Sequence, residues 1–202
     1  MSARVAPELA GLRDRKKAAS RETLARAAKQ LFHERGFGAV TVDDIAAAAN
    51  VSRRTFFRYF PTKEDAFFGR RAAQLEALEA LLAAPRPGER PFRTVRRALV
   101  ALSEQHEAGR AEILREHRVL AASPELLAKD LEWDRRALSA LAVALARGGG
   151  DPRRARLAAG AIVGVLRVVI EEWIDGGAVG DLRASGEEAL DLLEGLAPDR
   201  RG

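Results

Sequence analysis

The sequence predicts an all-α protein, and three observations support this fold class. Alanine, leucine and arginine dominate the 202 residues, whereas aromatic residues make up 5%. Apolar residues recur at helical spacing, and no segment shows the alternation of a half-buried strand. Glycine and proline fall mostly in short clusters, such as Pro85-Arg86-Pro87-Gly88, that separate the periodic segments. We therefore expect about nine helices and no sheet.

The first third of the chain has the pattern of a helix-turn-helix unit. Residues 1–17 lack apolar periodicity and are interpreted as a flexible basic arm. Gly36 provides a left-handed stop for the first helix, and Thr41 and Ser52 are good N-caps for two short helices that follow. The helices expected here cover residues 20–35, 42–49 and 53–60. This arrangement predicts a three-helix head at residues 18–66, with the helix-turn-helix motif at about 41–60.

A small apolar core is expected to hold these three helices together. The residues with the right spacing are Leu31, Phe32, Phe37, Ile45, Ala48, Val51, Phe56 and Phe60. The remaining chain continues in helices that we expect at residues 62–84, 91–106, 111–122, 124–147, 152–175 and 185–196. Residues 67–202 are therefore expected to form a second helical domain.

Charge is divided unevenly between the two parts. Residues 1–72 contain 15 Lys and Arg against 8 Asp and Glu, whereas residues 73–202 contain 19 against 21. A basic first part on a nearly neutral body favours a nucleic-acid-binding head on a separate module. A solvated basic face without a partner is the alternative that composition leaves open.

Several classes of function lack the residues they require. The chain has no cysteine, which excludes disulfides, thiolate metal sites and cysteine nucleophiles. None of the histidines His33, His106 and His117 follows a glutamate by three positions, and no nucleotide-binding or hydrolase fingerprint is present. We therefore expect no enzymatic activity, no metal and no cofactor.

No feature of the sequence points to a membrane. The longest apolar run, residues 158–166, is too short to span a bilayer and ends at Arg167. The first residues carry charges but no apolar segment of a secretory signal. A cytoplasmic location is expected.

Two segments carry a resemblance to a known family. Residues 41–67, TVDDIAAAANVSRRTFFRYFPTKEDAF, closely resemble the DNA-binding segment of TetR-family transcriptional regulators, and residues 24–37, LARAAKQLFHERGF, resemble their first helix. Within the family, TVDDIAAAA followed by RRTFFRYFP is most similar to actinobacterial regulators of the mycofactocin type. The resemblance covers roughly residues 18–68. There are two departures. Asn50 stands where the family usually has glycine, and Asp43 would face phosphate unfavourably if it pointed outward.

The resemblance implies which side chains touch DNA. Arg53 and Arg54 lie at the start of the recognition helix, in or near contact with bases, where arginine pairs bidentately with guanine. Phe57 is placed on a sugar or a thymine methyl. The resemblance places Thr41, Thr55, Tyr59 and Lys63 on phosphates, and Arg58 shares the same outward surface.

The resemblance also implies a dimeric repressor that binds a near-palindromic operator and is released by a small-molecule effector. Two apolar stripes near the C-terminus are expected to form the dimer interface, unless they complete the core of the chain itself. The first stripe comprises Ala158, Ala159, Ile162, Val163, Leu166, Val169 and Ile170, and the second comprises Ala189, Leu190, Leu192, Leu193 and Leu196. Trp173 is expected to take part in dimer packing. An architectural DNA-binding protein without an effector is the main alternative, and a helical-bundle enzyme is the other.

The effector site is expected among the helices that follow residue 67. The candidate contacts are His106, His117, Trp133, Arg136 and Arg167. Numerous arginines nearby favour an apolar effector with an anionic head, because arginine pairs well with carboxylate and phosphate. These arginines are Arg96, Arg97, Arg110, Arg115 and Arg118.

Overall fold

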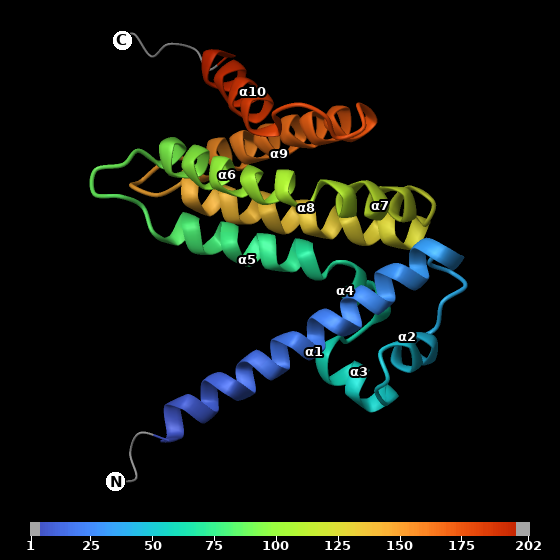
Figure 1. The fold of residues 1–202 in the computed structure, drawn as a ribbon. Helices are drawn as coiled ribbons and strands as arrows, with labels where there is room; N and C mark the ends of the chain where they lie inside the picture. Colours follow the sequence, from blue (N-terminus) through green and yellow to red (C-terminus); the bar gives the residue numbers. More distant parts are fainter. Residues whose placement is uncertain (1–4, 197–202) are drawn as a thin grey trace, which may run out of the picture. The chain divides into compact units, whose positions relative to one another are not determined.

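The computed structural model describes the backbone of residues 5–196 and the side chains of residues 18–103 and 109–194. Ten α-helices and no strand occur in this described backbone (Figure 1). The chain divides into two compact units. The first unit contains residues up to Arg70 together with Ala121–Ser123, and the second contains Arg71–Leu120 and the residues from Pro124 onward. None of the described helices is long and apolar enough to cross a membrane.

The first unit is built from α1 and three short helices. Their bounds are α1 (Val5–Arg35), α2 (Val42–Ala48), α3 (Arg53–Tyr59) and α4 (Lys63–Phe67). The expected flexible arm is wrong from Val5 onward, because α1 begins there. Alanine, leucine, lysine, arginine and glutamate, which favour helix, fill most of this segment. Pro7 lies in the first turn, where its missing N–H leaves no intrahelical bond unmade.

The second unit contains six further helices. They are α5 (Gly69–Ala83), α6 (Pro91–Ala108), α7 (Arg110–Ala121), α8 (Pro124–Leu145), α9 (Pro152–Asp175) and α10 (Leu182–Leu196). The single helix expected over residues 62–84 is therefore two helices, α4 and α5. The break falls at Phe68, which ends α4 with φ of −82° and ψ of 13°, a ψ far from that of a regular helix. Helix α10 begins earlier than expected because the Asp181 side chain accepts a hydrogen bond from the Ala184 N–H at 2.8 Å.

Aromatic rings from α1, α3 and the loop after α1 fill the core of the first unit. The rings of Phe32 and Phe37 lie 4.9 Å apart, and those of Phe56 and Phe60 lie 5.8 Å apart. All the core residues expected from the sequence are buried except Val51, which is half-buried, and Ala48, which is exposed. Ala46 is buried in this core, because it adjoins Ile45 on the inner face of α2.

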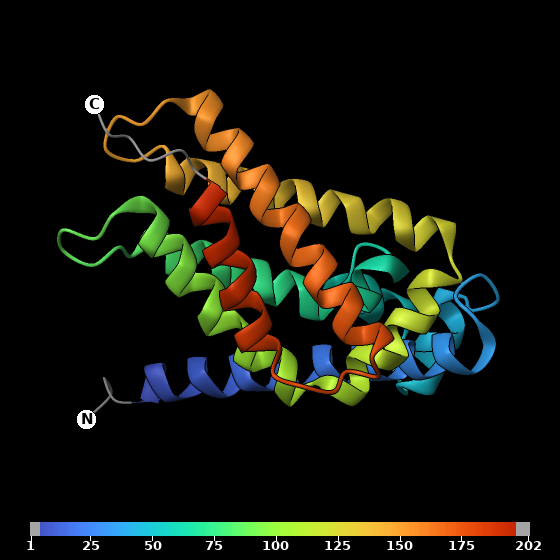
Figure 2. The same cartoon turned by 90° about the horizontal axis from the view of Figure 1, so that it is seen from above.

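The second unit has a large apolar core and a smaller one. Helices α8 and α9 pack along each other, and α10 packs against α9 and α6 (Figure 2). The large core consists of Leu75, Leu78, Leu82, Val95, Ala98, Leu102, Leu141, Ala144, Ala159, Ile162 and Leu190. In the smaller core Trp173 packs with Ile113, Ala178 and Leu182. Trp173 is therefore part of the core of its own chain, and its expected place in dimer packing is wrong.

Most of the two C-terminal stripes also complete the core of the chain. Ala159, Ile162, Ala189 and Leu190 are buried. Val163, Leu166 and Leu193 pack against the large core, and Val169 and Ile170 against the smaller one. Another set of small and apolar residues remains exposed on α9 at spacings of four, three and four. We call Leu157, Ala161, Gly164 and Val168 the α9 stripe.

Candidate nucleic-acid interface

Capping interactions define both short helices of the motif. The Asp44 N–H donates to the Thr41 hydroxyl at 3.2 Å, and the Thr41 N–H donates to Asp44 Oδ2 at 2.8 Å. These Thr41 hydrogen bonds lower the pKa of Asp44, so its carboxylate stays ionised at the start of α2. Asn50 takes a left-handed conformation, with φ of 53°, and makes the turn that the family usually makes with glycine. Ser52 then caps α3 by accepting from the Thr55 N–H at 3.1 Å.

Burial of one face of α3 determines which side chains point outward. Phe56 and Phe60 are fully buried, and α3 packs against α2. The opposite face exposes Arg53, Arg54, Phe57 and Arg58, and the Phe57 side chain is 44% exposed. Three cations around an exposed ring suit a surface that contacts nucleic acid, because arginine binds phosphates and base edges.

The three arginines of this face have different surroundings. Arg53 donates from Nη1 to Asp43 Oδ2 at 2.8 Å and stacks on Phe57. Arg58 stacks on the Tyr59 ring and donates to its hydroxyl at 3.2 Å. Arg54 is exposed and makes no hydrogen bond or ion pair with the described residues. Its guanidinium therefore has all its donors available.

The residues expected to contact phosphates already make hydrogen bonds within the chain, to different degrees. The Lys63 ammonium donates to the carbonyls of Phe37 and Val40, at 3.0 and 3.1 Å, and lies over the Phe37 ring. Lys63 therefore joins α4 to the loop after α1. Two of its three donors are used there, and the phosphate contact stays a prediction for the third. Thr41 and Thr55 use their hydroxyls in the caps described above, where they remain near the surface.

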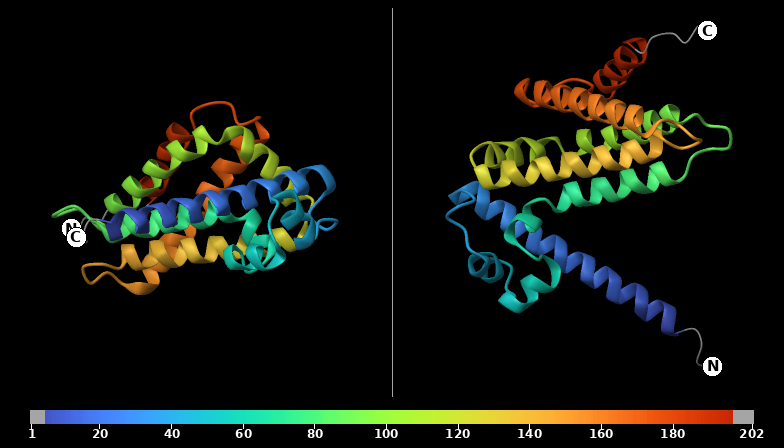
Figure 3. Two further views of the ribbon diagram at one scale, coloured as in Figure 1. Left: turned by 60° about the horizontal axis from the view of Figure 1, so that its bottom comes forward. Right: turned by 180° about the vertical axis from the view of Figure 1, so that it is seen from behind.

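The expected effector contacts that the structure describes have different surroundings. His106 lies outside the described side chains, and His117 is half-buried on α7. Arg136 stacks on Trp133, with its Cζ atom 4.7 Å from the ring centroid. Arg136 also borders a groove of about 320 Å³ between α5 and α8, helices that run side by side in Figure 3. The groove is lined by Glu79, Leu82, Arg136, Ser139, Ala140, Val143 and Arg147.

Arg167 belongs to a buried charge cluster that sequence reasoning missed. Its guanidinium contacts Asp130 at 3.5 Å, Glu171 at 2.9 Å and the Asp134 carboxylate. Arg71 on α5 approaches Asp130 at 3.0 Å and Asp134 at 3.6 Å. Asp130 is buried, and this desolvation raises its pKa despite the two arginines. The signal in the sequence was Asp130 and Asp134 on one face of α8, a helix with a mostly apolar inner face.

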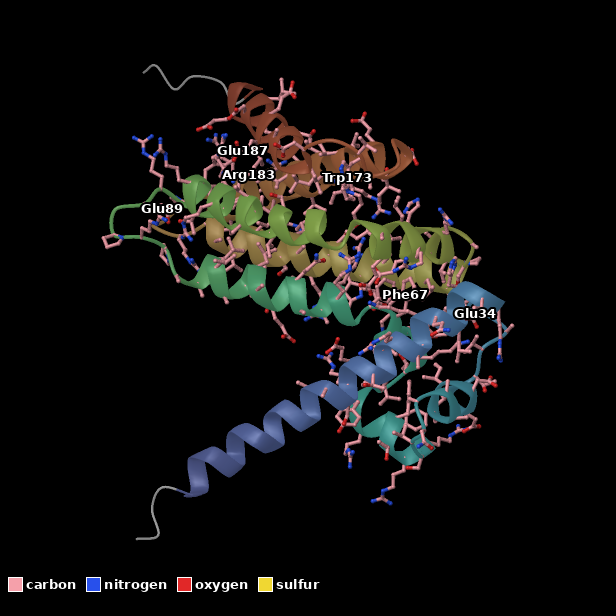
Figure 4. The ribbon with its side chains drawn as sticks, viewed as in Figure 1. Glu34, Phe67, Glu89, Trp173, Arg183 and Glu187 are labelled. Atoms are coloured by element: carbon pink, nitrogen blue, oxygen red, sulfur yellow. The ribbon has the colours of Figure 1, made fainter. Side chains whose placement is uncertain are left out.

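Two of the arginines expected near an anionic effector are engaged within the chain. Arg97 hydrogen-bonds to Glu89, a residue labelled in Figure 4, and this bond lowers the pKa of Glu89 to about 2. Arg96 pairs with the Asp191 carboxylate on α10. Arg110, Arg115 and Arg118 are exposed. The expectation that Arg96 and Arg97 await an anion is therefore wrong.

Family comparisons agree with the geometry of both units. Residues 24–68 match the model of the bacterial regulatory proteins of the TetR family, and residues 89–198 match that of the MftR C-terminal domain. The chain belongs to the TetR family. It is a DNA-binding transcriptional regulator, and the mycofactocin-type resemblance of the sequence is confirmed by the second match.

Relatives of this TetR-family chain include two transcriptional regulators. It is 33% identical to the transcriptional regulator TcmR of Streptomyces glaucescens, over 85% of this chain and 80% of the relative. It is 30% identical to the putative mycofactocin biosynthesis transcriptional regulator MftR of Mycobacterium tuberculosis, over 85% of this chain and 87% of that protein. A structure of Thermus thermophilus FadR, a TetR-family repressor in complex with lauroyl-CoA, matches with a TM-score of 0.54 and 26% identity. The match covers 86% of this chain and 93% of FadR.

Proposed function

We propose that this chain is a cytoplasmic, dimeric repressor that binds a two-fold DNA site through the exposed face of α3 and leaves it when a small molecule binds the second unit. The observation that carries the proposal is the outward face of α3. Arg53, Arg54 and Phe57 are exposed there, whereas the aromatic side chains of the opposite face are buried. Family membership supports the same reading, since residues 24–68 match the family's DNA-binding segment.

Arg54 is proposed as a principal base-reading residue because it is exposed and makes no hydrogen bond or ion pair with the described residues. The operator would first be obtained by selecting duplexes with a randomised centre. Arg54→Ala is then expected to lose about 1–3 kcal/mol of discrimination at one base pair of each half-site, the value of one bidentate contact. Fluorescence anisotropy with the selected duplex and single-base variants measures this loss.

The matched control is Arg135→Ala, which removes an exposed arginine from the second unit. Its base preference should equal that of the parent. An Arg54→Ala protein that kept the full preference of the parent would show that α3 is wrongly placed in the groove. Failure of the parent to enrich any sequence would contradict the proposed function itself.

Dimerisation is proposed through the α9 stripe and the exposed Leu192 of α10. Leu157 and Val168 are 60% and 51% exposed, and Ala161 and Gly164 between them allow close approach of a second helix. Two α9–α10 pairs would form a four-helix bundle that holds two α3 helices for a two-fold site. A near-palindromic operator has two equivalent half-sites, and a monomer with one DNA-binding unit would contact only one of them.

The effector is proposed to be an apolar molecule with an anionic head. FadR is similar to this chain and binds lauroyl-CoA, a long acyl chain with an anionic carrier. The groove between α5 and α8 combines apolar Leu82, Ala140 and Val143 with the guanidiniums of Arg136 and Arg147. Both observations favour an acyl ligand, and neither defines the length of its chain.

Acyl thioesters of increasing length provide the test of effector class. Release of the selected duplex is expected to strengthen by about 0.8 kcal/mol for each additional methylene that becomes buried, until the site is full. Anisotropy titration of the protein–DNA complex measures the midpoint for each length. Release that is absent, or that ignores chain length, would exclude this ligand class without affecting the DNA-binding proposal.

A further inference from the structure

An ion pair joins the two helices of the DNA-binding motif at their exposed ends. The Arg53 Nη1 group donates to Asp43 Oδ2 at 2.8 Å, and the two side chains are 61% and 64% exposed. Asp43 is the second residue of α2, and Arg53 is the first residue of α3. A contact between two flexible, hydrated side chains is unnecessary for packing, because neither residue belongs to the core.

A second contact further restricts the guanidinium. Its Cζ atom lies 5.5 Å from the centroid of the Phe57 ring, one turn further along α3. Arginine carries five N–H donors in a rigid plane, so the single bond to Asp43 leaves four donors for other partners. Asp43 and Phe57 therefore fix the plane of Arg53 without exhausting its capacity to bind a base edge.

A carboxylate at this surface also affects binding to the DNA backbone. The phosphates are negative, and Asp43 repels them, so its charge is unfavourable for binding that ignores sequence. An arginine without a partner would form an ion pair with any nearby phosphate. An arginine held by Asp43 loses this freedom, and the net charge of the pair is zero.

We propose that Asp43 is a positioning residue for sequence recognition, which holds Arg53 toward a guanine edge and reduces binding to DNA of other sequence. This inference rests on the proposed function. By charge alone Asp43 would weaken DNA binding. In this proposal it raises the ratio of specific to non-specific affinity.

Selection from a randomised duplex library tests the proposal with four variants. Arg53→Ala identifies the base position that Arg53 reads, because preference there disappears. Asp43→Asn keeps the shape of the side chain and removes its charge. It is expected to lower preference at that same position on the order of threefold or more, as residues in contact are coupled. Affinity for the unselected random duplex is expected to rise.

The double variant Asp43→Asn, Arg53→Ala separates positioning from a general effect. Its base preference is expected to equal that of Arg53→Ala alone, because Asp43 acts through Arg53. The charge-matched control is Glu34→Gln on α1, an exposed carboxylate labelled in Figure 4 that pairs with Gln30. It is expected to raise non-specific affinity without changing any base preference. Circular dichroism melts confirm that each variant is folded.

Three results would overturn the proposal. In the first, Asp43→Asn leaves base preference at the position read by Arg53 unchanged or increases it, which would show that Asp43 does not help Arg53 to recognise the base. In the second, Asp43→Asn alters all positions equally, as a change of net charge would. In the third, Arg53→Ala retains every preference, which would show that Arg53 reads no base. In all three cases the parent protein still enriches a sequence. If the parent enriches none, the proposed function itself is contradicted.

Discussion

The Val168→Glu variant is expected to be a monomer at micromolar concentration and to lose about a hundredfold or more in affinity for the selected duplex. Val168 is 51% exposed on α9 and shares one face with Leu157, Ala161 and Gly164. A glutamate within an apolar interface must be desolvated without a partner, which opposes association. The fold of the single chain should survive, because the side chain already faces outward.

The loss in DNA affinity follows from the geometry of two linked heads. In a dimer, binding of one head brings the second to its half-site at high effective concentration, which contributes about 10²–10⁴ in affinity. A monomer keeps its α3 surface but loses this contribution. Sedimentation equilibrium measures the association state, and anisotropy with full and half operators measures binding.

Leu131→Glu is the matched control for this experiment. Leu131 is 49% exposed on α8 and lies outside both the α9 stripe and the groove between α5 and α8, so the substitution adds the same charge elsewhere. It should remain dimeric and bind as the parent does. If Val168→Glu stays dimeric alongside it, the α9 stripe is not the interface.

Helix ends and the DNA-binding motif could be predicted from sequence because their signals are local. Gly36 and Asn50 both take left-handed conformations, and Thr41 and Ser52 cap their helices as expected. Each of these features depends on residues within a few positions along the chain. The identity of the family followed from the same segment.

The exposed residues of α9 and the charge cluster could not be predicted because they depend on distant helices. Periodicity identifies an apolar face but not the element that covers it. On α9, Ile162 and Leu166 meet the core of the chain, whereas Val168 remains exposed. Similarly, Asp130 is surrounded by arginines from α5 and α9, and nothing local to α8 indicates which arginines these are.

The internal role of Lys63 was missed for the same reason. Its position at the start of α4 predicts a phosphate contact, and nothing local indicates that its ammonium also reaches two carbonyls in the loop after α1. Asp43 posed the opposite problem. As a charge near DNA it seemed unfavourable, and only its contact with Arg53 shows what compensates it.

Removal of the Asp130 carboxylate is expected to cause the largest loss of stability among the charge substitutions considered for the second unit. Asp130 is 1% exposed and lies between Arg71 on α5 and Arg167 on α9. Asp130→Ala leaves a cavity and reduces the negative charge beside two guanidiniums. Breaking a buried pair costs about 3–5 kcal/mol, and we expect about 2–3 kcal/mol here because Asp134 remains beside both arginines.

Tryptophan fluorescence in a urea titration measures this loss in the correct unit. Both tryptophans of the chain, Trp133 and Trp173, lie in the second unit, on α8 and α9. Protein concentration must be held constant, because dimerisation contributes to apparent stability. Asp175→Ala, which removes an exposed carboxylate at the end of α9, is the control and should change stability little.

Comparison of the parent with Asp130→Asn is expected to show how the ionisation of Asp130 makes stability depend on pH. The alanine variant does not isolate this effect, because it also leaves a cavity. Burial raises the pKa of Asp130 in the folded protein, so between its ordinary value and the raised value the folded state binds more protons than the unfolded state. The stability that protonated Asp130 contributes is therefore present at low pH and is lost as pH rises through the folded pKa. Asparagine keeps the shape without this titration. The advantage of the parent over Asp130→Asn should accordingly shrink as the pH rises from the ordinary carboxyl value of 3.8 through the raised pKa of Asp130. An advantage that is constant over this range, or that grows with pH, would show that the two arginines outweigh the burial of the carboxylate.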